Sequence, residues 1–230
     1  MTWKDMAKKI VWLGHDCFRV DAEKVVYFDP YQISGGPKAD LILVSHDHFD
    51  HCSPEDVAKI QGKDTTIVTI AAAASQLTGN IQIVKPGDEL TVQGVKIQAV
   101  PAYNVNKFRS PGQPFHPKSM QGNGYVIKLG GETLYHAGDT DFIPEMAQLD
   151  VTVALLPAGS VGERRRLLAL EGRAHPRLRT GLEVDPGGPV GGDPHAVERQ
   201  GLGQGPVPLG RAELPAGSPG DRRCPARPDG

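Results

Sequence analysis

The feature that most constrains this chain is an apolar run that leads directly into a cluster of metal-binding side chains. The continuous apolar residues 41–44 are typical of a strand covered on both faces. The next seven residues, 45–51 (Ser-His-Asp-His-Phe-Asp-His), contain three histidines and two aspartates. Imidazole and carboxylate groups bind metals near pH 7, and His46 and His48 point the same way on extended backbone. The segment predicts a metal site at the end of a buried strand.

Three further motifs accompany this one: residues 12–15 (Trp-Leu-Gly-His), 28–30 (Phe-Asp-Pro) and 135–140 (Tyr-His-Ala-Gly-Asp-Thr). With His-x-His-x-Asp-His at 46–51, the chain resembles the metallo-β-lactamase-fold hydrolases. The order of the motifs is similar to that of the ascorbate-6-phosphate lactonase-like and N-acylphosphatidylethanolamine phospholipase-like branch. The resemblance implies an α/β fold, an αββα sandwich. We expect it to be incomplete at its C-terminal end, because the family's closing elements are not recognisable after residue 160.

The resemblance also implies a ligand set for two divalent metal ions, with zinc favoured and manganese or iron as alternatives. His46 and His48 would bind one ion, Asp50 and His51 the second, and Asp139 would bridge both. A hydroxide shared by the two ions would then be the nucleophile. Asp50 is also the candidate catalytic proton acceptor, although its ligand role ranks first.

Four other residues are candidate ligands or substrate contacts. Many relatives carry a histidine where this chain has Asn104, a poor zinc ligand that can hydrogen-bond substrate or water. His116, in the same loop, is the local substitute, with an ordinary loop histidine as the alternative. His15 is expected to orient a ligand or to face substrate, with a purely structural hydrogen bond as the alternative. His136 either contacts substrate or packs in the core.

The composition changes sharply near residue 160. Residues 1–160 contain 12 Lys and 2 Arg, whereas residues 161–230 contain no Lys, 11 Arg, 14 Gly and 10 Pro. The predicted domains are therefore 1–159, the hydrolase-like domain, and 160–230, a Gly/Pro/Arg-rich tail. Three interpretations of the tail stay open: a disordered linker, a poorly patterned subdomain, or translation out of frame, which we favour. The final family histidine has no match, and His175 and His195 in the tail are weak replacements.

The pattern predicts strands and helices around the metal motif. Ser53 is a predicted N-cap, and Pro54 a first helical residue, of a helix that braces the motif. A long loop over 101–124 is predicted to form a wall of the active site. The expected strands are 9–13, 17–20, 25–28, 39–44, 66–70, 81–84, 89–92, 95–100, 125–129, 133–136 and 151–156, with helices at 53–60, 71–77 and 142–149.

Charge and cysteine usage bound the partners. The formal net charge of −2 implies no nucleic-acid-binding surface. Three scattered cysteines favour a reducing, cytoplasmic location, and no apolar run approaches the length that spans a membrane. Lys107, Arg109 and Lys118 make the long loop basic, which favours an anionic small-molecule substrate. The oligomeric state is left open.

The leading hypothesis is a metal-dependent hydrolase that acts on an ester, lactone, amide or phosphodiester small molecule. The alternative is a catalytically impaired, effectively truncated homologue that retains a partial metal site. This alternative follows from the tail composition and from the missing final histidine.

Overall fold

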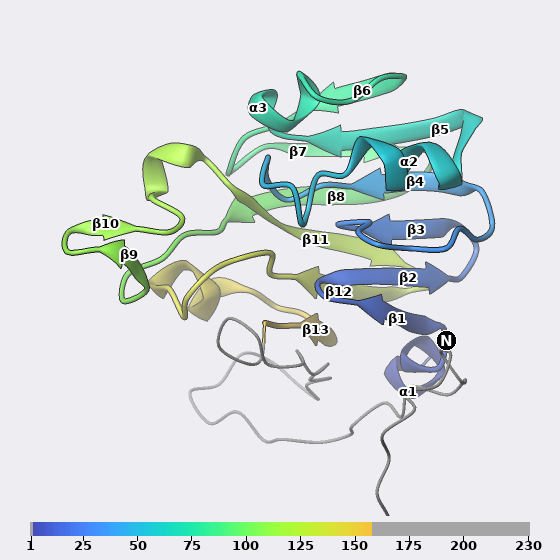
Figure 1. The fold of residues 1–230 in the computed structure, drawn as a ribbon. Coiled ribbons are helices and arrows are strands. Elements are labelled where there is room, and N and C mark those ends of the chain that lie inside the picture. Colours follow the sequence, from blue (N-terminus) through green and yellow to red (C-terminus); the bar gives the residue numbers. More distant parts are fainter. Residues whose placement is uncertain (1, 158–230) are drawn as a thin grey trace, which may run out of the picture. The chain divides into compact units, whose positions relative to one another are not determined.

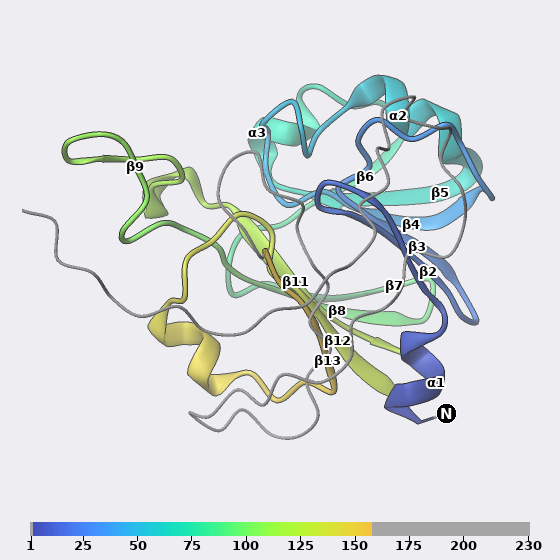
Figure 2. The same ribbon diagram turned by 60° about the horizontal axis from the view of Figure 1, so that its bottom comes forward.

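The computed structural model describes residues 2–157, and the predicted tail, with His175 and His195, lies outside the described residues. The described residues form two sheets that face each other (Figures 1 and 2). The first sheet has the order β1-β2-β3-β4-β5-β6. Its strands are β1 (Ile10–Gly14), β2 (Cys17–Asp21), β3 (Val25–Phe28), β4 (Ala39–Leu43), β5 (Gln61–Thr69) and β6 (Asn80–Ile83).

The second sheet has the order β13-β12-β11-β8-β7, in which β7, β8, β11 and β12 are antiparallel and β13 runs parallel to β12. Its strands are β7 (Glu89–Val92), β8 (Val95–Pro101), β11 (Asn123–Leu129), β12 (Glu132–His136) and β13 (Val153–Leu155). A separate hairpin, β9 (Phe108–Ser110) with β10 (Gln113–Pro114), projects from the edge toward which β4 and β8 run (Figure 1).

Apolar side chains from both sheets fill the space between them. Alternation along each strand sends one set of side chains inward, so that Phe28 and Leu43 of the first sheet and Ile127 and Leu134 of the second belong to one buried cluster. The opposite face of the first sheet packs against α2 (Pro54–Ile60) and α3 (Ala71–Ala74) through Val57, among others. The result is a two-sheet sandwich with helices on the outer face of the first sheet.

Helix α2 begins as predicted. Ser53 is the N-cap and its Oγ accepts from the Asp56 backbone N–H, while Pro54 occupies the first turn. The Asp56 carboxylate also accepts from the backbone N–H groups of Gln32 and Ile33 at 2.8 and 3.1 Å. This buried carboxylate therefore ties the helix to the loop after β3, next to the metal motif.

The structure corrects several predicted elements. β5 begins at Gln61, five residues earlier than expected, and α3 stops at Ala74 because the chain tightens into turns before Gly79. The predicted helix over 142–149 is the 3-10 helix η2 (Pro144–Gln148), and the long loop contains β9, β10 and the 3-10 helix η1 (Lys118–Met120). Helix α1 (Trp3–Ala7), which begins with a capping box between Thr2 and Asp5, was not predicted. Within residues 2–157, no helix is long and apolar enough to cross a membrane.

Candidate metal centre

His46 lies directly beyond the end of β4, and a chain of hydrogen bonds fixes its tautomer. The Ser45 hydroxyl lies 2.6 Å from Asp29 Oδ2 and 2.9 Å from His46 Nδ1. An ionised carboxylate only accepts, so the single hydroxyl hydrogen goes to Asp29 and His46 Nδ1 must donate to Ser45 Oγ. His46 Nε2 is thereby left as the acceptor atom. Burial, followed by the nearby His51, lowers the pKa of His46 well below its ordinary value, which keeps the ring neutral.

His116 joins this cluster from the long loop. Its Nε2 lies 3.1 Å from His48 Nδ1, and its ring centroid is 4.8 Å from that of His46. One potential ligand atom from each of the three histidines lies within 4.8 Å of the others. The structure therefore brings the substitute histidine predicted from the sequence to the metal motif.

Asn104 orients His116 and does not face the centre as an independent ligand. Its Oδ1 accepts from the backbone N–H of His116 at 3.1 Å and lies 2.8 Å from His116 Nδ1, while the Asn104 backbone N–H donates to the His116 carbonyl. An amide oxygen can only accept, so His116 Nδ1 carries the hydrogen and Nε2 is the acceptor. This contact occupies Asn104 Oδ1, and a hydrogen bond from Asn104 to substrate or water stays a prediction.

His51 is held by a buried carboxylate. Its Nδ1 donates to Asp29 Oδ2 at 2.7 Å, and Asp29 Oδ1 accepts from the Ser45 backbone N–H. Burial by itself lowers the pKa of His51, but the charges of Asp29 and Asp139 outweigh burial and raise it well above its ordinary value. Asp29 has a φ of 42°, an uncommon conformation for a non-glycine residue that this network holds in place.

Asp50 and His15 form the outer side of the cluster. His15 Nε2 lies 3.2 Å from Asp50 Oδ2, and the His15 and His51 rings meet edge to face. Burial opposes ionisation of Asp50, but the hydrogen bond from His15 and the charge of His51 outweigh it and lower its pKa to about 2. An ionised carboxylate is suited to ligation, and the role of Asp50 as a catalytic proton acceptor stays a prediction.

Asp139 approaches both halves of the cluster. Its Oδ2 lies 3.5 Å from His51 Nε2 and 3.5 Å from His116 Nε2. Gly138 before it has a φ of 60°, and a Cβ there would lie 2.9 Å from Ser45 Cβ. A side chain at this position would therefore crowd Ser45 and disturb the turn after β12 that brings Asp139 to the motif.

The donor atoms fit divalent metal ions. His46 Nε2 is buried and forms no hydrogen bond among the described residues, whereas the buried His51 Nε2 lies 3.5 Å from Asp139 Oδ2. The neutral His46 ring presents an acceptor nitrogen, and a metal would displace the proton from His51 Nε2 beside Asp50 and Asp139. Orphaned buried nitrogens are costly unless something binds them, and imidazole with carboxylate is a ligand set that suits several divalent metals.

One candidate, His136, lies outside this arrangement. His136 is buried between the sheets, where its ring stacks on Phe28 with centroids 4.8 Å apart and its Nε2 lies 3.1 Å from the Asp16 carbonyl. These surroundings are those of the packing alternative and not of a substrate contact. Asp16 itself, which the sequence reasoning did not single out, lies 3.9 Å from His51. The sequence signal that could have identified Asp16 is its position next to His15 in the turn between β1 and β2.

The basic character of the long loop is largely neutralised. Lys107 lies 3.0 Å from Asp141, and Lys118 lies 2.8 Å from Glu145. The Arg109 guanidinium lies 5.6 Å from the centroid of the Phe115 ring. Two of the three cations that favoured an anionic substrate are therefore paired with carboxylates.

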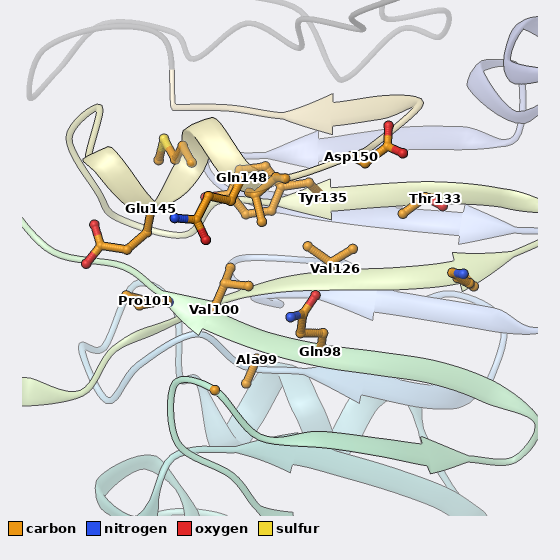
Figure 3. Close-up of a pocket in the computed structure, with 14 residues that line it drawn as sticks. Gln98, Ala99, Val100, Pro101, Val126, Thr133, Tyr135, Glu145, Gln148 and Asp150 are labelled. Atoms are coloured by element: carbon orange, nitrogen blue, oxygen red, sulfur yellow. The ribbon is translucent and has the colours of Figure 1, made fainter. Parts of the chain in front are cut away.

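A cavity of about 450 Å³ lies elsewhere, on the outer face of the second sheet (Figure 3). Val100, Val126 and Tyr135 line it from the strands, and Glu145 and Gln148 line it from η2. None of the candidate site residues lines it. The metal motif and this cavity are separate features.

Comparison with known proteins identifies the family. The sequence model described as the β-lactamase superfamily domain matches residues 9–169. A UPF0173 metal-dependent hydrolase of Thermococcus kodakarensis is 32% identical over 213 residues, which cover 83% of this chain and 91% of the relative. The chain belongs to the UPF0173 metal-dependent hydrolases of the β-lactamase superfamily. It is an enzyme by lineage.

A UPF0173 relative from Thermoplasma acidophilum is 33% identical over 171 residues, covering 66% of this chain and 70% of the relative. A solved structure, named as a metal-dependent hydrolase of Parabacteroides distasonis, is 34% identical with a TM-score of 0.58, covering 65% of this chain and 69% of that one. The α/β metallo-β-lactamase fold predicted from the motifs is thus confirmed. Nothing in these comparisons supports the alternative of an impaired homologue.

Proposed function

We propose that this UPF0173 hydrolase uses two divalent metal ions to hydrolyse an ester, lactone, amide or phosphodiester small molecule. His46, His48 and His116 would hold one ion, His51 and Asp50 the second, and Asp139 would be shared. The observation that carries the proposal is the position of Asp139 Oδ2, 3.5 Å from a histidine of each group. Zinc is the favoured metal, with manganese or iron as alternatives.

Divalent ions in such a site polarise a carbonyl or phosphoryl oxygen and lower the pKa of water, which is the chemistry of metal-assisted hydrolysis. The residues of this chain prepare the site for them. Asp29, Ser45 and Asn104 bind the Nδ1 atoms of His51, His46 and His116, so that each Nε2 is the atom offered to a metal. A metal would displace the proton from His51 Nε2. Asp50, ionised at neutral pH, adds a carboxylate beside His51.

The assignment to the lactonase-like and phospholipase-like branch stays a prediction, as does a cytoplasmic location. A substrate panel tests the reaction class: a p-nitrophenyl ester, an aryl lactone, a p-nitroanilide and bis(p-nitrophenyl) phosphate. The full chain is stripped with a chelator and then reloaded with zinc, manganese or ferrous iron. We expect turnover of at least one class that disappears with the chelator and returns with metal. Turnover that is insensitive to the chelator, or no turnover of any class, contradicts the proposal.

A further inference from the structure

Most of the exposed large hydrophobic side chains lie on the segments that carry the candidate metal-site residues. Six such side chains occur in residues 2–157, and all but Ile83 lie on segments that carry site residues. Scattered single apolar side chains are ordinary on a protein surface, whereas a group at one site calls for an explanation. We call these five residues the apolar rim: Phe49 (74% exposed), Val105 (49%), Phe108 (48%), Phe115 (37%) and Phe142 (76%).

Two phenylalanines flank the contact between the two halves of the histidine cluster. Phe49 lies between His48 and Asp50 in the metal motif, and Phe115 immediately precedes His116. The ring centroids of His48 and His116 are only 4.8 Å apart. Because Phe49 and Phe115 are the sequence neighbours of these histidines, the backbone of both phenylalanines lies beside the centre. The Tyr31 ring, 5.9 Å from that of Phe49, extends this side of the rim.

The remaining rim residues are fixed at the base of the β9–β10 hairpin. The Asp141 carboxylate accepts from the backbone N–H groups of Val105 and Asn106, both at 2.8 Å, and Phe142 directly follows Asp141. Phe108 pairs with Pro114 across the hairpin, next to Phe115. These three residues are therefore held by the same two loops that deliver His116 and Asp139 to the centre.

We propose that the apolar rim binds an alkyl or aryl group attached to the scissile bond, so that the substrate class is hydrophobic esters, amides or related acyl compounds. This inference rests on the proposed function. The charges favour a small molecule over an anionic membrane surface, because Lys107 and Lys118 of the hairpin loop are each paired with a carboxylate. An anionic membrane surface is bound through unpaired clusters of Lys and Arg.

The test measures binding separately from turnover. Butanoate, hexanoate and octanoate are titrated calorimetrically into the metal-loaded full chain. Full burial of each methylene strengthens binding about fourfold, so on a partly open rim we expect about twofold or more per methylene. The variants Phe49→Ser and Phe142→Ser are expected to flatten this dependence on chain length. Ile83→Ser is the matched control, because Ile83 is 62% exposed but lies outside the rim, and it should keep the wild-type dependence.

Equal affinity for butanoate and octanoate overturns the proposal, as does an Ile83→Ser variant that flattens the dependence as much as the phenylalanine variants do. The rim could instead be covered by a second copy of this chain, and light scattering tests this alternative. A wild-type dimer that dissociates in Phe142→Ser would make the rim an interface between copies and would also overturn the proposal. The two proposals fail separately. Chain-length-dependent binding without hydrolysis contradicts the proposed reaction but not the proposed role of the rim. Equally efficient hydrolysis of p-nitrophenyl acetate and p-nitrophenyl octanoate, with no chain-length preference in binding, contradicts the role of the rim but not the reaction.

Discussion

Nε2 of His116 lies 3.1 Å from Nδ1 of His48, although 68 residues separate the two histidines in the sequence. This proximity completes the first group of three nitrogen donors without a histidine at position 104. It also makes the long loop part of the centre, because Asn104 and His116 hold each other through reciprocal hydrogen bonds.

Replacing His116 with alanine is expected to weaken metal binding more than the 10–100-fold typical of residues that only support a ligand. The reason is that one of three clustered nitrogen donors is removed. Competition with a chromogenic chelator measures the affinity. The contradicting result is an His116→Ala protein that binds metal as tightly as the wild type.

Replacing Asn104 with alanine is expected to weaken metal binding by about 10–100-fold. The change removes the acceptor that fixes the His116 ring and leaves its buried Nδ1–H unpaired, which also costs about 1–3 kcal/mol of unfolding free energy. Asn106→Ala is the matched control, because Asn106 is exposed in the same loop. Asn104 has no orienting role if both variants bind metal equally and Asn104→Ala loses only stability.

Gly138→Ala tests the turn that places Asp139. Alanine at a φ of 60° costs about 1–2 kcal/mol, and its Cβ would lie 2.9 Å from Ser45 Cβ and 3.0 Å from the Asn123 carbonyl oxygen. Gly112→Ala is the control, since Gly112 has a φ of 75° and nothing within 4 Å of the added Cβ. Denaturant unfolding should show a larger loss for Gly138→Ala by about 1–3 kcal/mol, with weakened metal binding in that variant alone. Equal losses would mean that crowding at Gly138 is unimportant.

Asp56 predicts a pH-dependent contribution to stability. Burial alone would raise its pKa, but hydrogen bonds from Ser53, Lys59 and the Gln32 backbone outweigh burial and lower it. A lowered folded-state pKa gives stability that is present above the unfolded value of about 3.9 and is lost as the pH falls through the folded value. Asp56→Asn should therefore be less stable than the wild type by about 1–3 kcal/mol at pH 7, with the difference shrinking below about pH 4.

Denaturant unfolding between pH 3 and pH 8 measures this difference. Asp64→Asn serves as the control, because its exposed carboxylate lies 3.8 Å from Lys63 on the surface. A constant difference between Asp56→Asn and wild type across this range would show that the charge of Asp56 is not what stabilises the loop.

The sequence predicted the strands and the metal motif because their signals are local, whereas the sandwich was implied by the family resemblance of the motifs. Apolar runs specify the strands, and Ser53 with Pro54 specifies the start of α2 to the residue. The hairpin β9–β10 was missed because its short strands are mostly exposed and show no apolar alternation. The roles of Asn104 and Asp29 depend on contacts across 12 and 22 residues. No local pattern could assign such contacts, and motif order alone left each role open.

The ion pairs of the long loop likewise could not be predicted from the local sequence. Lys107 and Lys118 made the loop basic in the sequence, but their partners Asp141 and Glu145 lie 34 and 27 residues away. Net charge along a segment does not report which cations are paired after folding. The substrate preference expected from those cations therefore loses most of its basis, and the exposed phenylalanines become the stronger indication.

The central claim is a centre that binds two divalent ions, and metal content tests it most directly. The full chain is stripped with a chelator, reloaded with zinc, freed of excess metal and analysed by inductively coupled plasma mass spectrometry. We predict two equivalents of zinc per chain, reduced by Asp139→Ala because that carboxylate approaches both histidine groups. One equivalent or none in the wild-type chain would contradict the account.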